Sequence, residues 1–170
     1  MVRDSIVGLW GGDGERESGT LNLLSVGERK EAMQGVRHGG CNCGAVRLEV
    51  RGEPMRAGLC HCLTCRKETG APFMAFAVWD QSQVSVAGDT RSWTQTTDHR
   101  HFCPSCGSSL FGAHDADSEV EVRLGCFDEA PTDLNPEYEL WISRREHWLS
   151  LVADAAQHTR SSLFGHINAQ

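Results

Sequence analysis

The segment 45–51, AVRLEVR, alternates between apolar and polar side chains at nearly every step. Successive side chains of a β-strand point to opposite faces, so a period of two predicts a strand with one buried face. Val46, Leu48 and Val50 would form that face. The polar residues between them would then face solvent.

Six further short strands are predicted, each bounded by Gly, Pro, Asp or Ser residues. They are Phe73–Trp79, Gln83–Val86, His99–Phe102, Ser109–Gly112, Glu119–Leu124 and Tyr138–Ile142. Helix signals are weak: one or two turns over Leu63–Thr69, and a short terminal helix over Ser150–His158. Many short strands with little helix predict an all-β domain.

The chain of 170 residues suits a single hydrophobic core. Residues 1–35 are rich in Gly, Glu and Ser without sustained periodicity, so we expect a disordered N-terminal extension. Met33, just before the first motif, is a candidate translation start. We expect one folded domain over residues 36–150 and a C-terminal tail over residues 151–170, frayed after Arg160.

The charge and hydropathy of the chain narrow the classes of partner. A formal net charge of -7 argues against tight nucleic-acid binding, which needs clustered Lys and Arg. No apolar run approaches the roughly 18 residues that span a bilayer, so we expect no membrane partner and a cytoplasmic protein. In a reducing compartment, closely spaced cysteines more often hold metal than form disulfides, and this chain has eight cysteines.

Two cysteine pairs at metal-binding spacing lie about sixty residues apart. Cys41 and Cys43 stand in GCNCG, and Cys103 and Cys106 stand in CPSCG. Together they offer four thiolates, which suffice for a closed tetrahedral zinc site of the structural type. The alternatives are buried apolar cysteines or two disulfides. The paired spacing and the flanking glycines favour a structural zinc.

A third motif, CHCLTC, places Cys60, Cys62 and Cys65 within six residues. These three thiolates can hold a second zinc and leave its fourth position open, as in catalytic sites. His61 lies between two of the cysteines, where alternation would point its side chain away from the metal. The remaining alternative is a second structural zinc, closed by a distant His, Asp or Cys126.

Three further residues have to be placed relative to these motifs. Cys126 has no cysteine nearby and is expected to be a small buried apolar residue. Arg66 and Lys67 follow the CHCLTC motif, where their charges would stabilise thiolates or attract a substrate carboxylate, or would simply be solvated.

The order of these motifs resembles the glutathione-dependent formaldehyde-activating enzyme family, also called the centromere protein V family, over residues 36–149. The matching segments are GGCNCGAVRLEV, CHCLTCRKETGAPF, HFCPSCGSSLF, LGCFDEA and YELWISRREHWL. The resemblance implies an Mss4-like fold of short antiparallel strands organised around zinc. It also implies two zinc ions per chain, one structural and held by Cys41, Cys43, Cys103 and Cys106, the other catalytic and held by Cys60, Cys62 and Cys65.

The same resemblance implies a carbon–sulfur lyase that reversibly joins glutathione and formaldehyde as S-(hydroxymethyl)glutathione. A small thiol and an aldehyde would then be its partners. One alternative is a zinc-stabilised binding module without turnover, although the basic tail that would suit such a role is absent. The other is a thiol redox or metal sensor in which Cys60, Cys62 and Cys65 release zinc on oxidation.

Overall fold

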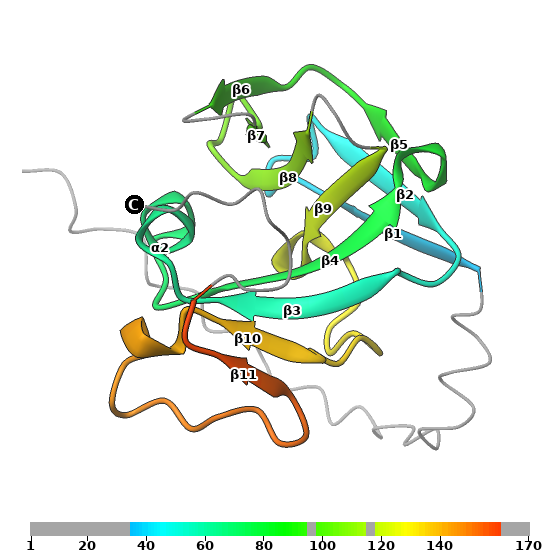
Figure 1. The fold of residues 1–170 in the computed structure, drawn as a ribbon. Coiled ribbons are helices and arrows are strands. Elements are labelled where there is room, and N and C mark those ends of the chain that lie inside the picture. Colours follow the sequence, from blue (N-terminus) through cyan, green and yellow to red (C-terminus); the bar gives the residue numbers. More distant parts are fainter. Residues whose placement is uncertain (1–34, 95–97, 115–117, 161–170) are drawn as a thin grey trace, which may run out of the picture.

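The computed structural model describes residues 35–94, 98–114 and 118–160 (Figure 1). Within these ranges the chain forms eleven strands, one α-helix and three short 3-10 helices. The strands are β1 (Val36–Gly40), β2 (Arg47–Arg51), β3 (Arg56–Cys60), β4 (Met74–Asp80), β5 (Val84–Ala87), β6 (Arg91–Thr94), β7 (Asp98–Phe102), β8 (Ser109–His114), β9 (Glu119–Arg123), β10 (Tyr138–Leu140) and β11 (Ala156–His158). The helices are α2 (Leu63–Thr69), η1 (Gln81–Gln83), η2 (Leu124–Cys126) and η3 (Ile142–Arg144).

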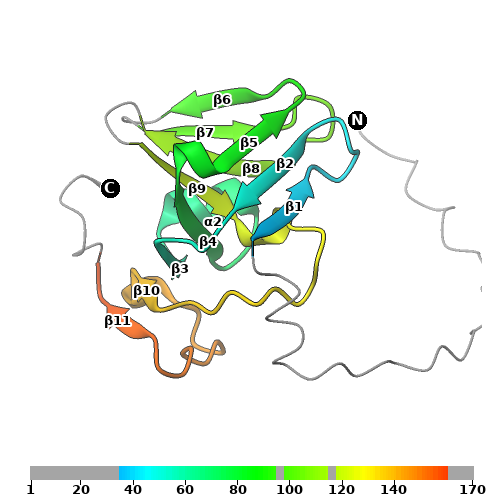
Figure 2. The same cartoon turned by 90° about the vertical axis from the view of Figure 1, so that its right-hand side faces the viewer.

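The strands form two sheets. A three-stranded sheet has the order β1-β2-β5, and an eight-stranded sheet has the order β11-β10-β3-β4-β9-β8-β7-β6. Figure 2 shows the small sheet lying across one face of the large one. Pairing is antiparallel except at one end of the large sheet, where β10 runs parallel to both β3 and β11.

The main core lies between the two sheets. Val46, Leu48 and Val50 are fully buried there, as the alternation in segment 45–51 predicts. They pack in one cluster with Trp79 of β4 and Leu110 of β8. Burying such a side chain contributes roughly 1.5–3 kcal/mol. This core therefore fixes the small sheet against the large one.

A second apolar cluster surrounds the CHCLTC motif. Its members are Cys60, Cys62, Cys65, Met74, Phe76, Val78, Tyr138, Leu140 and Trp141. They come from β3, β4, β10 and the start of α2, together with Trp141 directly after β10. The three cysteines therefore lie in an environment from which water is largely excluded.

The structure confirms the seven predicted strands within one or two residues at their ends, and it confirms the helix over Leu63–Thr69. The mostly β fold with little helix is also as expected. The predicted helix over Ser150–His158 is wrong: its last residues form β11, which pairs with β10. A short isolated helix is marginal, and the pairing with β10 provides backbone partners that a helix would forgo.

The predicted N-terminal extension, Gly35 apart, lies outside the described residues, as does the last part of the predicted tail. In the described ranges, no helix is long and apolar enough to cross a membrane.

Candidate metal centre

The two cysteine pairs that are distant in the sequence meet at one site. Cys41 and Cys43 lie in the turn between β1 and β2, and Cys103 and Cys106 lie in the turn between β7 and β8. Their four Sγ atoms all lie within 4.8 Å of one another. Gly107 closes the second turn with a φ of 76°, a left-handed conformation that glycine adopts without strain. We call this the four-cysteine cluster.

The spacing of the sulfur atoms fits a tetrahedral metal ion. The Sγ atoms of Cys41 and Cys43 are 3.5 Å apart, and those of Cys43 and Cys103 are 3.8 Å apart. Four sulfurs that each lie about 2.3 Å from a zinc ion would be roughly 3.8 Å apart. All eight cysteines of the chain are free thiols, so the disulfide alternative does not apply to this structure.

Nearby polar groups support thiolates in the four-cysteine cluster. The backbone N–H of Val46 donates to Cys41 Sγ over 3.2 Å. The hydroxyl of Ser108 lies 3.3 Å from Cys106 Sγ and lowers the pKa of Cys106 to about 5. Hydrogen bonds to a thiolate favour its charged form, which is the form that binds metal.

Cys60, Cys62 and Cys65 form a second group, which we call the three-cysteine cluster. Cys60 ends β3, Cys62 is the N-cap of α2, and Cys65 lies in the first turn of that helix. Cys62 Sγ accepts a hydrogen bond from the backbone N–H of Cys65 over 3.4 Å. The three Sγ atoms lie within 4.8 Å of one another, and all three residues are buried.

The three thiols interact too strongly to ionise together without a cation. Hydrogen bonds from the thiols of Cys60 and Cys65 lower the pKa of Cys62. The contact with Cys62 raises the pKa of Cys60, and the contacts with Cys60 and Cys62 raise the pKa of Cys65. One thiolate is thus stabilised at the expense of the other two. A bound cation would supply the charge that lets all three become thiolates.

His61 does not join the three-cysteine cluster. It is buried, and its Nε2 lies 2.9 Å from Oε2 of Glu139 on β10. Glu139 also accepts hydrogen bonds from the Val152 N–H, the Arg145 guanidinium and the Gln157 side chain. The loop between the cysteines is therefore anchored to β10 and to the segment that leads into β11.

Cys126 stays outside both clusters, as expected for a small buried residue. Its Sγ lies 3.0 Å from the carbonyl oxygen of Ser109, to which it donates. Burial raises the pKa of Cys126 to about 11, although Arg123 opposes the shift. A thiol with so high a pKa is a poor metal ligand and a poor nucleophile at neutral pH.

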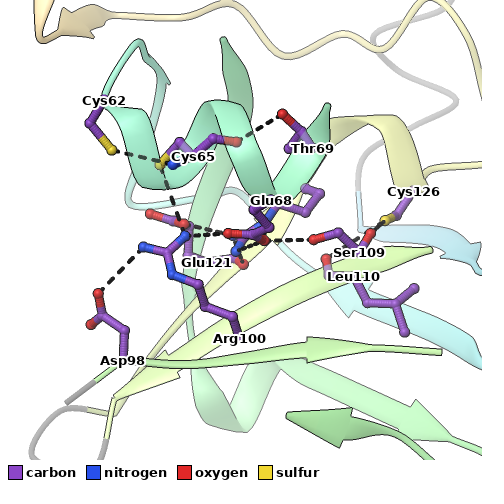
Figure 3. Close-up of polar contacts among 11 residues, drawn as sticks. Cys62, Cys65, Glu68, Thr69, Asp98, Arg100, Ser109, Leu110, Glu121 and Cys126 are labelled. Carbon is purple, nitrogen blue, oxygen red and sulfur yellow. Dashed lines mark hydrogen bonds and ion pairs between the residues drawn. The ribbon is translucent and has the colours of Figure 1, made fainter. Parts of the chain in front are cut away.

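The cation beside the three-cysteine cluster is Arg100, which the sequence did not single out. Its Nη1 lies 3.9 Å from Cys65 Sγ (Figure 3). Arg66 instead bonds to Glu146 and to the carbonyl oxygens of Pro72 and Arg144. Arg66 thus joins α2 to the η3 region and has a structural role.

A cavity of about 700 Å³ lies beside Arg100 and α2. It is lined by Leu63, Thr64, Lys67, Glu68, Trp93, Arg100, His101, Phe102, Gly107 and Ser109. Lys67 has no ion pair with any residue that the structure describes. Of the two basic residues that follow CHCLTC in the sequence, only Lys67 lines this cavity.

Comparison with known proteins agrees with the motif order. A family model described as glutathione-dependent formaldehyde-activating enzyme matches residues 36–144. A Schizosaccharomyces pombe protein named as an uncharacterized lyase is 34% identical over 77 residues, which cover 45% of this chain and 56% of that protein. The chain therefore spans little more than half the length of this curated relative.

A crystal structure of a Rhodobacter sphaeroides protein is 27% identical and covers 58% of this chain and 91% of its own, with a TM-score of 0.42. The family match extends over most of the chain and includes both cysteine clusters. This chain belongs to the glutathione-dependent formaldehyde-activating enzyme family.

Proposed function

We propose that this protein is a zinc-dependent carbon–sulfur lyase that forms or cleaves a thiol–aldehyde adduct such as S-(hydroxymethyl)glutathione. The observation that carries the proposal is the three-cysteine cluster, a buried set of three converging thiols for which the described chain supplies no fourth ligand. An incomplete ligand set distinguishes catalytic from structural zinc. Family membership and the lyase name of the yeast relative support the reaction class.

In this proposal the two clusters have different roles. Cys41, Cys43, Cys103 and Cys106 would hold a structural zinc, and Cys60, Cys62 and Cys65 would hold a catalytic zinc. The bound cation would supply the positive charge that favours the deprotonated form of a substrate thiol.

The reaction needs no oxidant or reductant. The sulfur of the thiol forms a bond to the carbonyl carbon of the aldehyde, and the carbonyl π bond breaks. The thiol proton ends on the former carbonyl oxygen, which becomes a hydroxyl group. The reverse reaction breaks the same carbon–sulfur bond and returns the proton to sulfur.

The residues around the cavity suit the binding of an anionic thiol. Lys67 presents an ammonium group that can pair with a carboxylate, and the neighbouring Arg100 adds a second positive charge. Trp93 and Phe102 provide apolar surface. We propose that the thiol binds in this cavity with its carboxylate near Lys67, and that its sulfur extends past Arg100 toward Cys65, which does not itself line the cavity.

The test combines zinc analysis with an adduct-formation assay on wild type, Cys62→Ala and Cys126→Ala. We expect two zinc ions per wild-type chain. Cys62→Ala should retain about one zinc and its fold but lose activity, because it removes a ligand of the open site. Cys126→Ala is the matched control, a buried cysteine outside both clusters, and should keep both zinc ions and activity. One zinc per wild-type chain without turnover would instead favour a structural module.

A further inference from the structure

Arg100 is held in place from several sides. Its guanidinium forms an ion pair with Glu68 of α2, and its Nη2 lies 3.5 Å from Oδ2 of Asp98. The ring of Trp93 lies 5.8 Å from its central carbon. Only 11% of the side chain is exposed. A buried and restrained cation interacts more strongly with nearby charge than a mobile surface cation does.

Glu68, which orients Arg100, is itself fixed by two further residues. Its Oε1 accepts from Ser109 Oγ over 2.6 Å and from Arg123 Nη2 over 2.7 Å. The side chains of Glu68 and Arg123 are 4% and 5% exposed. Figure 3 shows Ser109 and Arg100 in contact with Glu68, and Arg100 in turn in contact with Cys65. The position of Arg100 is thus set by a buried network and does not depend on solvent.

The net charge of a metal-loaded three-cysteine cluster suggests what this network does. Three thiolates around a divalent cation leave one net negative charge in an apolar environment, where uncompensated charge is costly. Among the described contacts of the three cysteines, the one between Arg100 Nη1 and Cys65 Sγ places a positive charge nearest to that centre. Outer residues that contact metal ligands commonly set metal affinity.

We propose that Arg100, oriented by Glu68, is a positioning residue that balances the charge of the three-cysteine cluster and so determines how tightly this cluster retains zinc. The inference rests on the proposed assignment of zinc to that cluster. It concerns metal retention and not the identity of the substrate.

The test measures zinc affinity by competition with a chromogenic chelator in the full-length protein. Arg100→Met should weaken the three-cysteine site, identified as the site that is lost in Cys62→Ala, by about 10- to 100-fold, the usual range for loss of a residue that supports a metal ligand, and should leave the other site unchanged. Arg100→Lys keeps the charge but cannot bond to Glu68 and Cys65 in the same way, so we expect an intermediate loss. Glu68→Asp keeps the carboxylate charge but shortens the side chain that contacts Arg100, so it should weaken the same site because Arg100 loses its orienting contact.

Arg56→Met is the matched control, because Arg56 is a partly buried arginine in the same sheet whose ion pair is with Glu119. It should leave both zinc affinities at wild-type values. Unaltered zinc affinity at both sites in Arg100→Met would overturn the proposal. An equal loss of affinity at both sites with an altered circular dichroism spectrum would overturn it as well, because it would show a general loss of structure. Because the measurement does not use turnover, a wild-type protein without lyase activity could still support this inference.

Discussion

At the scale of single residues, the Glu139 carboxylate connects the CHCLTC loop to the C-terminal segment of the described chain. It is 1% exposed, and its two oxygens accept hydrogen bonds from His61, Arg145, Val152 and Gln157. Burial opposes the charged carboxylate, but these donors outweigh burial and lower the pKa of Glu139. The network ties the CHCLTC loop to the last strand of the sheet.

We predict that Glu139→Gln destabilises the protein by about 1–3 kcal/mol, because the new amide turns one acceptor oxygen into a donor facing two other donors. The matched control is Glu137→Gln, an exposed carboxylate two residues earlier that should have little effect. Urea unfolding at pH 7 measures both. An effect of Glu139→Gln no larger than that of the control would show that the network contributes little.

The same carboxylate gives a pH dependence of known sign. Because the folded pKa of Glu139 is lowered, its contribution to stability is complete above the unfolded value of about 4.3 and is lost as pH falls through the folded pKa. The stability difference between wild type and Glu139→Gln should therefore be constant from pH 7 to about pH 5 and shrink below pH 4. A difference that grows on acidification would contradict this assignment.

The sequence revealed the cysteines but not the charged residues around them. Cysteine spacing is local, so CHCLTC and CPSCG can be recognised without knowledge of the fold. Arg100 reaches Cys65 only because β7 and α2 pack together, and no local pattern records that contact. A weaker signal did exist for Glu68, since residues three apart in a helix share a face and Cys65 precedes it by three.

At the scale of elements, α2 carries Cys65 and is only seven residues long, so its ends matter. Its C-cap is Gly70, with a φ of 66°. A Cβ at this position would meet no atom within 4 Å, so a substitution there changes backbone strain and not packing. The left-handed conformation costs other residues about 1–2 kcal/mol.

We predict that Gly70→Ala lowers the free energy of unfolding by about 1 kcal/mol, near the lower end of that backbone cost. Gly125→Ala is the control, because its added Cβ also meets nothing within 4 Å but its φ is not positive. Chemical unfolding of both variants compares them directly. Equal stabilities would mean that the helix end relaxes without cost.

Alternation makes a strand easy to predict, and several strands without it were missed. The pattern in β2 has one buried face and is readable. β3, with the sequence RAGLC, is buried along almost its whole length and has no period of two. β11 has only three residues and exists because β10 lies beside it. Tertiary pairing, which the sequence does not display, decides such short elements.

At the scale of the whole molecule, the two clusters close very different lengths of chain. The four-cysteine cluster joins the β1–β2 turn of the small sheet to the β7–β8 turn of the large sheet, and Cys43 and Cys103 are 60 positions apart in the sequence. The three-cysteine cluster closes only the short stretch from Cys60 to Cys65. Closing a long loop removes far more conformational freedom from the unfolded chain than closing a short one.

We therefore predict that Cys103→Ser lowers the free energy of unfolding by about 2 kcal/mol more than Cys62→Ser does. Both variants would lose a proposed metal ligand at a buried cysteine, but only Cys103→Ser would also free the long loop that joins the two sheets. Urea unfolding followed by tryptophan fluorescence reports both variants. A larger loss in Cys62→Ser would reverse the roles of the two clusters, because it would make the three-cysteine cluster the one that holds the fold together.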